Sequence, residues 1–163
     1  MHKAFYLSIS LLIVIVALEA FITGSNRNLK TVDADFIVDT LATGLIVPWA
    51  FTFIDRNILM FTERSGKVRL MKNDKLIEKP LLVLQETNTT KKMGLLGLCK
   101  HPDFEINHFL YLAYNYTADK TPFLRIVRYT FARDSLLNPF IITDSIYGNQ
   151  NHTVCRLKFG LDK

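Results

Sequence analysis

After residue 34 the chain alternates short apolar runs with turn residues, and apolar residues seldom recur at helical spacing for more than one turn. In the run RIVRYTF, residues 125–131, even-numbered residues would face one side of an extended strand and odd-numbered residues the other. The runs are rich in β-branched and aromatic side chains, which favour strands. We predict strands at Asp35–Leu41, Trp49–Ile54, Asn57–Glu63, Lys67–Lys72, Leu95–His101, His108–Tyr116, Phe123–Phe131 and Asn138–Ser145.

Turn residues stand between these strands, as at Pro48, Ser65-Gly66 and Asn73-Asp74. Gly and Asn tolerate positive φ and Pro presets the turn, so the strands should follow one another as antiparallel hairpins. An all-β fold of this kind is a sandwich, a barrel or a propeller, and the pattern alone does not choose among them. A propeller blade takes about 40 to 50 residues, so residues 35–163 would supply about three blades.

The N-terminal 25 residues have a different pattern. His2 and Lys3 precede the uncharged run Ala4–Leu18, AFYLSISLLIVIVAL. A membrane-spanning helix needs roughly 20 apolar residues and the core of a signal peptide about 7 to 15, so the run favours a cleaved signal peptide. An uncleaved anchor is the alternative, and the only one that would place the protein on a membrane. Either reading predicts export to the periplasm, the cell surface or the medium, with residues 26–34 as a linker.

Composition and charge narrow the class of protein. The chain has 163 residues, 49% of them apolar and 21% charged, which is typical of a globular domain. The net charge is +5, but Lys and Arg occur as scattered pairs such as Lys91-Lys92. Because there is no dense basic run and no aromatic platform, we expect no nucleic-acid partner.

Two cysteines and one acidic residue are candidates for chemistry. Cys99 and Cys155 belong to no Cys/His cluster, which argues against zinc and leaves a disulfide and two buried thiols both open. Glu63 and Arg64 are predicted to form a charge pair at the end of a strand. No second carboxylate stands at a spacing that would make Glu63 an acid catalyst. The residues give no metal site.

Four segments appear in order along residues 35–163: VPWAFTFIDRNILMFTERSGKVRLM, MGLLGLCKHPDFEINHFLYLAYNY, RIVRYTFARDSLLNPF and HTVCRLKFGLDK. Together they resemble the soluble pyrroloquinoline-quinone (PQQ)-dependent glucose and aldose sugar dehydrogenases. The resemblance implies a six-bladed β-propeller, of which this chain would be an incomplete N-terminal part. It also implies PQQ and calcium at the propeller mouth. Their ligands are expected mostly beyond Lys163, so no cofactor-binding or metal-binding residue is assigned here.

The resemblance assigns a catalytic role to His152. In the family, the histidine of an H-x-x-G-R-L segment takes the proton from the sugar C1 hydroxyl while hydride passes to the quinone, and His152 stands at that position, followed by Arg156 and Leu157. An imidazole suits this role because its unperturbed pKa of about 6.5 lies near neutrality.

Three positions depart from the family pattern. Cys155 replaces a glycine, Asn151 replaces the acid that often precedes the histidine, and Lys92 replaces the sugar-contacting glutamine two residues before GLLG. Lys92 and Asn151 are therefore the candidate substrate-binding residues. An ammonium only donates hydrogen bonds and adds positive charge, so Lys92 would change substrate recognition. The alternative for Lys92 is an ordinary solvated lysine.

The sequence thus predicts that the full-length protein oxidises an aldose sugar or related polyol with PQQ and passes electrons to an external acceptor, while this chain alone is inactive. The alternative is a non-catalytic propeller that binds a protein or glycan at the cell surface.

Overall fold

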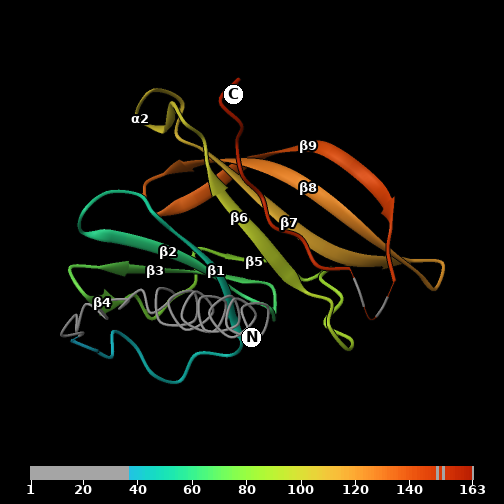
Figure 1. Cartoon of the computed structure of the whole chain (residues 1–163), viewed down its shortest axis with the longest axis horizontal. Coiled ribbons are helices and arrows are strands. Elements are labelled where there is room, and N and C mark those ends of the chain that lie inside the picture. The colour runs from blue at the N-terminus through green and yellow to red at the C-terminus, as the bar shows by residue number, and fades with distance from the viewer. Residues whose placement is uncertain (1–36, 150, 152, 163) are drawn as a thin grey trace, which may run out of the picture. The chain divides into compact units, whose positions relative to one another are not determined.

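A computed structural model describes residues 37–149, 151 and 153–162 (Figure 1). The chain divides into two units, Met1–Val38 and Asp39–Lys163, and only Ile37 and Val38 of the first are described. The predicted signal peptide or anchor and the linker lie outside the described residues. No helix in the described part of the chain is long and apolar enough to cross a membrane.

The second unit contains two antiparallel sheets whose strands follow one another along the chain. The first sheet has the order β1-β2-β3-β4, with β5 also paired to β3, and the second has the order β6-β7-β8-β9. The first comprises β1 (Pro48–Phe53), β2 (Ile58–Glu63), β3 (Lys67–Lys72), β4 (Lys75–Leu76) and β5 (Leu82–Val83). The second comprises β6 (Leu95–Lys100), β7 (Phe109–Ala118), β8 (Thr121–Ala132) and β9 (Ser135–Tyr147), with the short helix α2 (Phe104–Asn107) between β6 and β7.

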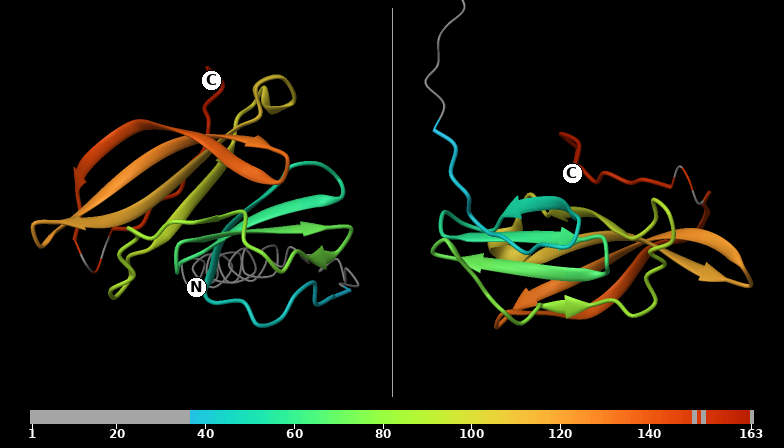
Figure 2. Two further views of the ribbon diagram at one scale, coloured as in Figure 1. Left: turned by 180° about the vertical axis from the view of Figure 1, so that it is seen from behind. Right: turned by 90° about the horizontal axis from the view of Figure 1, so that it is seen from below.

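The two sheets share one hydrophobic core. The first sheet contributes Met60 and Leu70, and the second contributes Leu112 and Val127, all of them buried. Strand β6 lies against β1 and β2, which brings the sheets together (Figures 1 and 2). Burial of this apolar surface is the main force holding the sheets together, because each sheet has one predominantly apolar face.

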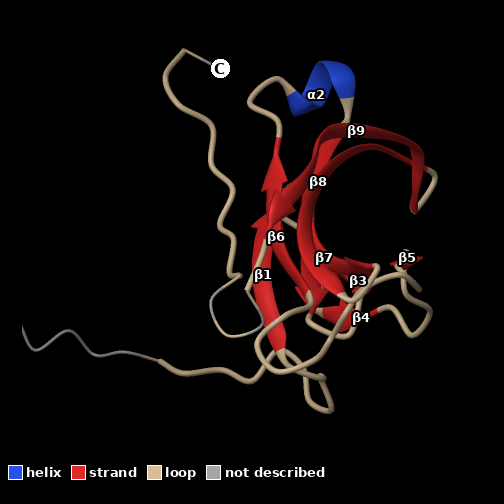
Figure 3. Cartoon of the chain, turned by 90° about the vertical axis from the view of Figure 1, so that its right-hand side faces the viewer, coloured by secondary structure: helices blue, strands red, loops and turns tan. Residues whose placement is uncertain are grey.

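The long strands of the second sheet are irregular and curved. The pairing of β8 with β9 shifts register at several points, and β9 contains two residues with positive φ, Asn138 and Ser145. Bulges of this kind bend a strand and increase its twist. Figure 3 shows β8 and β9 curling round as a result.

The all-β prediction is confirmed, and seven of the eight predicted strands overlap observed ones. The prediction of a strand at Asp35–Leu41 is wrong for its described part, because residues 37–41 form no strand. Ile37 and Val38 are 95% and 91% exposed. Their β-branched side chains favour a strand, but no described strand pairs with them to supply backbone hydrogen bonds. The described residues after β9 add no further strand, and the number of blades in the full-length protein stays a prediction.

Candidate functional site at the loop corner

Three connections meet at one end of the second sheet. They are the loop between β5 and β6, the turn between β7 and β8, and the chain that follows β9. The amide of Gly148 donates to the carbonyl of Pro122 at 2.9 Å, which joins the last two. A hollow of about 310 Å³ opens here, lined by Lys91, Pro122, Tyr147, Gly148, Asn149 and Asn151. We call these residues, together with Lys92, the loop corner.

A tight turn after β9 holds Asn151. The Thr153 amide donates to the Asn149 carbonyl at 3.1 Å, and the Thr153 hydroxyl oxygen accepts from the Asn149 amide at 2.5 Å. The Asn151 amide donates to the side-chain oxygen of Asn149 at 2.9 Å. Thr153 is buried while Asn151 is exposed. The turn is therefore anchored on its inner side and presents Asn151 to solvent.

Lys91 and Lys92 lie on the loop before β6. Arg64 donates from Nη1 to the Lys91 carbonyl at 2.8 Å, and the Arg64 carbonyl accepts from the Leu95 amide at 3.1 Å. Both lysines are exposed. The loop that carries Lys92 thus lies beside Asn151, but Lys92 is not among the residues that line the hollow, and both substrate-binding assignments stay predictions. Lys91, which the sequence interpretation did not single out, lines the hollow itself.

Asn115 fixes both ends of this loop from inside the second sheet. It is fully buried, its amide donates to the Gly94 carbonyl at 3.0 Å, and its side-chain oxygen accepts from the Gly94 amide at 3.2 Å. Its carbonyl accepts from the Asn88 amide at 2.8 Å. Asn115 was not among the predicted site residues. Its only signal in the sequence is a lone amide within the otherwise apolar and aromatic strand LYLAYNY.

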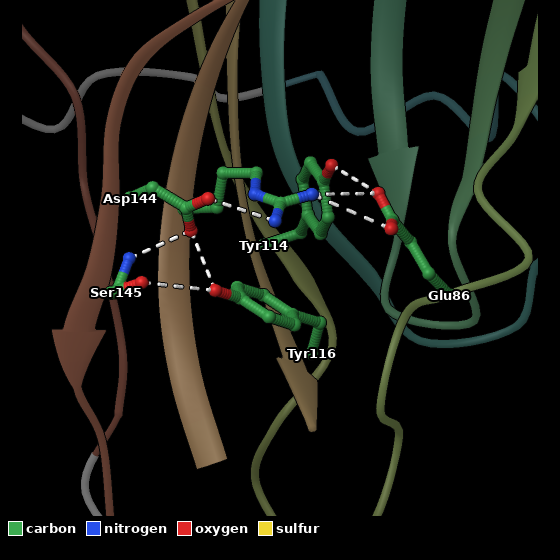
Figure 4. A network of polar contacts seen from close by, with 6 residues as sticks. Glu86, Tyr114, Tyr116, Asp144 and Ser145 are labelled. Atoms are coloured by element: carbon green, nitrogen blue, oxygen red, sulfur yellow. Dashed lines mark hydrogen bonds and ion pairs between the residues drawn. The ribbon is translucent and has the colours of Figure 1, made fainter. Parts of the chain in front are cut away.

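A charged network fastens the same loop to the sheet (Figure 4). Arg125 on β8 pairs with Asp144 on β9 at 2.8 Å and with Glu86 on the loop at 3.3 Å. Tyr114 donates to Glu86 at 2.5 Å, and Tyr116 donates to Asp144 at 2.6 Å and stacks under the guanidinium. The hydrogen bond from Arg125 lowers the pKa of Asp144 to about 2. The Asp144 carboxylate is therefore held ionised, which suits a structural role better than proton transfer.

The predicted charge pair of Glu63 with Arg64 is wrong. Glu63 is fully buried and pairs instead with Arg69 at 3.5 Å, while its Oε1 also accepts from the Ile46 amide at 3.0 Å. Glu63 is the last residue of β2 and Arg64 already lies in the turn that follows. A residue on the neighbouring strand can share a face with Glu63, and Arg69 on β3 does so.

Cys99 and Cys155 are both free and half-buried. The chain after β9 runs parallel to β6, because Gly97 faces Leu157 and Cys99 receives a backbone hydrogen bond from Phe159 (Figure 1). In that register Cys155 lies four residues before the position beside Cys99, or roughly 13 Å away. A disulfide needs Cα atoms within about 7 Å, so the buried-thiol alternative holds. Burial raises the pKa of both thiols.

His152 lies outside the described residues, so its catalytic assignment stays a prediction. Of the two residues that follow it in the matching segment, Arg156 is exposed and Leu157 is half-buried. Among the described residues no three His, Cys, Asp or Glu side chains are grouped to hold a metal ion. Among the described residues that line the hollow, Lys91 is the cation.

A larger hollow of about 720 Å³ lies away from the loop corner, on the first sheet. Its walls include Trp49, Phe51, Phe53 and Leu59. Trp49, Phe51 and Phe53 are all more than 40% exposed. With so few polar groups, this hollow is suited to packing against another apolar surface and offers little chemistry.

Comparison with known proteins decides the family. The sequence model described as Glucose / Sorbosone dehydrogenase matches residues 45–163, which is most of the chain. The chain belongs to the glucose/sorbosone dehydrogenase family. It is also 25% identical over 101 residues to an uncharacterized protein of Synechocystis, a match that covers 57% of this chain and 24% of that protein.

Solved structures of dehydrogenases share the fold of this family member. A putative oxidoreductase (glucose dehydrogenase) from Thermus thermophilus is 25% identical, with a TM-score of 0.68, and the match covers 76% of this chain and 37% of that one. The PQQ-bound aldose sugar dehydrogenase from Streptomyces coelicolor is 23% identical, with a TM-score of 0.68, covering 78% and 39%. The chain thus spans well under half the length of these structures.

Proposed function

We propose that the full-length protein is an exported sugar dehydrogenase that oxidises an aldose or related polyol with PQQ and calcium. The observation that carries the proposal is the family match across residues 45–163. A matched structure from Streptomyces coelicolor, similar in fold, is a PQQ-bound aldose sugar dehydrogenase. The loop corner adds support, because it joins Asn151 to the loop of Lys92 around one hollow.

In the proposed reaction His152 removes the proton of the sugar C1 hydroxyl as that carbon loses a hydride. Bound PQQ would supply the two-electron acceptor, and an external acceptor would reoxidise it. Asn151 can both donate to and accept from sugar hydroxyls, whereas Lys92 can only donate. The turn from Asn149 to Thr153 fixes where the Asn151 amide stands. The chain's own contribution is therefore to remove a proton and to orient hydroxyl groups.

Dye-linked oxidation of a broad aldose and polyol panel tests the proposal. The full-length gene product would be loaded with PQQ and calcium, and bound PQQ would be confirmed by its absorbance. We expect dye reduction with at least one sugar and none when PQQ is withheld. No turnover on the whole panel, with PQQ bound, would remove the sugar dehydrogenase assignment.

A second candidate is a non-catalytic propeller that binds a protein or glycan at the cell surface. The departures at Lys92, Asn151 and Cys155 favour it, because Lys92 replaces the sugar-contacting glutamine and the other two change the segment around His152. Calorimetry that detects no PQQ binding to the full-length gene product, together with binding of a defined glycan, would select this candidate over the enzyme.

A further inference from the structure

Three cations at or beside the loop corner have no carboxylate partner. Arg64, Lys91 and Lys92 make no ion pair with any described residue, although four other ion pairs are present. The guanidinium of Arg64 is used to hold the Lys91 carbonyl. The two ammonium groups are exposed and adjacent in sequence. The positive charges of these three side chains are therefore not neutralised by direct ion pairs with described residues.

The acids around the loop corner offset that charge only in part. Glu86, on the same loop, and Asp144, on β9, are both paired with Arg125 between them. The turn between β7 and β8 carries Asp119 next to Lys120, one charge of each sign. Arg125 balances only one of the two carboxylates, so this network keeps one negative charge. Against it stand the three positive charges of Arg64, Lys91 and Lys92, and the excess of positive charge around the loop corner attracts anions.

The hollow beside the lysines carries groups suited to a polyhydroxylated ligand. Its volume of about 310 Å³ lies at the small end of the range for ligand sites. The Asn151 side-chain amide makes no hydrogen bond within the described part of the chain, so it is available to a ligand. Tyr147 is 77% exposed and presents an apolar ring with a hydroxyl at its edge.

We propose that the loop corner binds sugars that carry a carboxylate, with Lys91 and Lys92 contacting the anion and Asn151 and Tyr147 contacting the sugar. The substrate class is then an acidic aldose such as a uronate, with a neutral hexose as the weaker ligand. This proposal rests on the proposed function for its sugar, while its charge preference rests on the unpaired lysines alone.

Binding of glucuronate and glucose distinguishes the classes, because the two sugars differ only by the C6 carboxylate. Calorimetry on the cofactor-free full-length gene product should show glucuronate binding at least about tenfold tighter than glucose, as expected for charge-assisted hydrogen bonds. The preference should weaken as salt is raised. The double variant Lys91→Gln/Lys92→Gln should bind both sugars about equally. Lys79→Gln, at an exposed lysine remote from the hollow in sequence, is the matched control and should keep the preference.

Equal affinity for the two sugars, no measurable glucuronate binding, or a preference unchanged in the double variant would overturn the proposal. The proposed function is tested by a different result. A lysine-dependent glucuronate preference without any dye-linked oxidation would support the anion site and remove the dehydrogenase assignment. Glucose oxidation without the glucuronate preference would support the dehydrogenase assignment and remove the anion site.

Discussion

Glu63 is a carboxylate buried from solvent within the first sheet, and its charge is balanced by Arg69, whose side chain is only 12% exposed. Removing one partner of such a pair leaves the other charge buried without compensation. We expect Glu63→Ala to lower the free energy of unfolding of the full-length gene product by about 3 to 5 kcal/mol. Chemical denaturation measures this loss.

The exposed pair of Lys72 with Asp134, 2.6 Å apart, is the matched control. Water screens such pairs, so Asp134→Ala should cost less than about 1 kcal/mol. If the two variants lost the same stability, burial of Glu63 would not be the reason for its effect.

Asp144 gives the corner network a pH dependence. The bond from Arg125 holds the pKa of Asp144 at about 2 in the folded protein, below its ordinary value of 3.8. A lowered folded pKa contributes stability above the ordinary value, which is lost as the pH falls through the folded pKa. We predict that stability falls between about pH 4 and pH 2 less steeply in Asp144→Asn than in the wild type. Urea unfolding across this range is the measurement, and parallel pH profiles would contradict the assignment.

At the residue scale, the sequence could predict the candidate positions but not their partners. Lys92 and Asn151 stand at fixed distances from recognisable motifs, so a linear reading finds them. The partners of Arg125, on β8, depend on strand register. Tyr114 lies opposite Arg125 on β7, and Asp144 pairs with it from β9. The loop that carries Glu86 follows no periodic pattern. The network therefore became visible only in three dimensions.

At the scale of elements, Gly94 determines how the loop corner joins β6. Its φ is +152°, and a Cβ there would lie 2.4 Å from the Arg64 carbonyl oxygen. Backbone cannot move aside as a flexible side chain can, so Gly94→Ala combines conformational strain with a clash. We expect a loss of more than about 2 kcal/mol of stability.

A Gly44→Ala variant separates the cost of conformational strain from the cost of the clash. Its φ is +70°, but a Cβ there would meet nothing within 4 Å, so Gly44→Ala tests strain without a clash. Its cost should be about 1 kcal/mol. Thermal unfolding of the two variants compares them, and a loss as small for Gly94→Ala as for Gly44→Ala would show that β6 can shift away from Arg64.

A predicted strand formed where a neighbouring strand could exchange backbone hydrogen bonds with it, and the prediction failed where the described residues offer no such neighbour. β2 and β3 pair in unbroken register from Ile58 to Glu63, and both match their predicted positions closely. Residues 37–41 have the same β-branched character but no partner in the described part of the chain. Local composition therefore located the strands, and pairing decided which of them formed. The predicted β9 was too short because a register shift between Leu137 and Phe140 lets the strand continue past Asn138 and Pro139, and the predicted β8 was too short because Pro122 pairs with Thr117 at the end of β7.

At the scale of the whole molecule, binding of PQQ and calcium is predicted to need residues outside the described part of the chain. Among the described residues no three His, Cys, Asp or Glu side chains are grouped to hold a metal ion. We therefore expect the 163-residue chain, expressed alone, to bind no PQQ in the presence of calcium. Calorimetry with PQQ and calcium checks this, and stoichiometric PQQ binding to the chain alone would contradict it.

The central claim of this account is that sugar oxidation by the full-length protein depends on His152 as the base. The most direct measurement is kcat of the PQQ-loaded full-length gene product and of its His152→Ala variant on the best sugar of the panel, with PQQ occupancy matched by absorbance. A positioned base contributes about 10² to 10⁴ in rate, so kcat of the variant should fall by that factor while PQQ stays bound. A variant that keeps the wild-type kcat would contradict the claim.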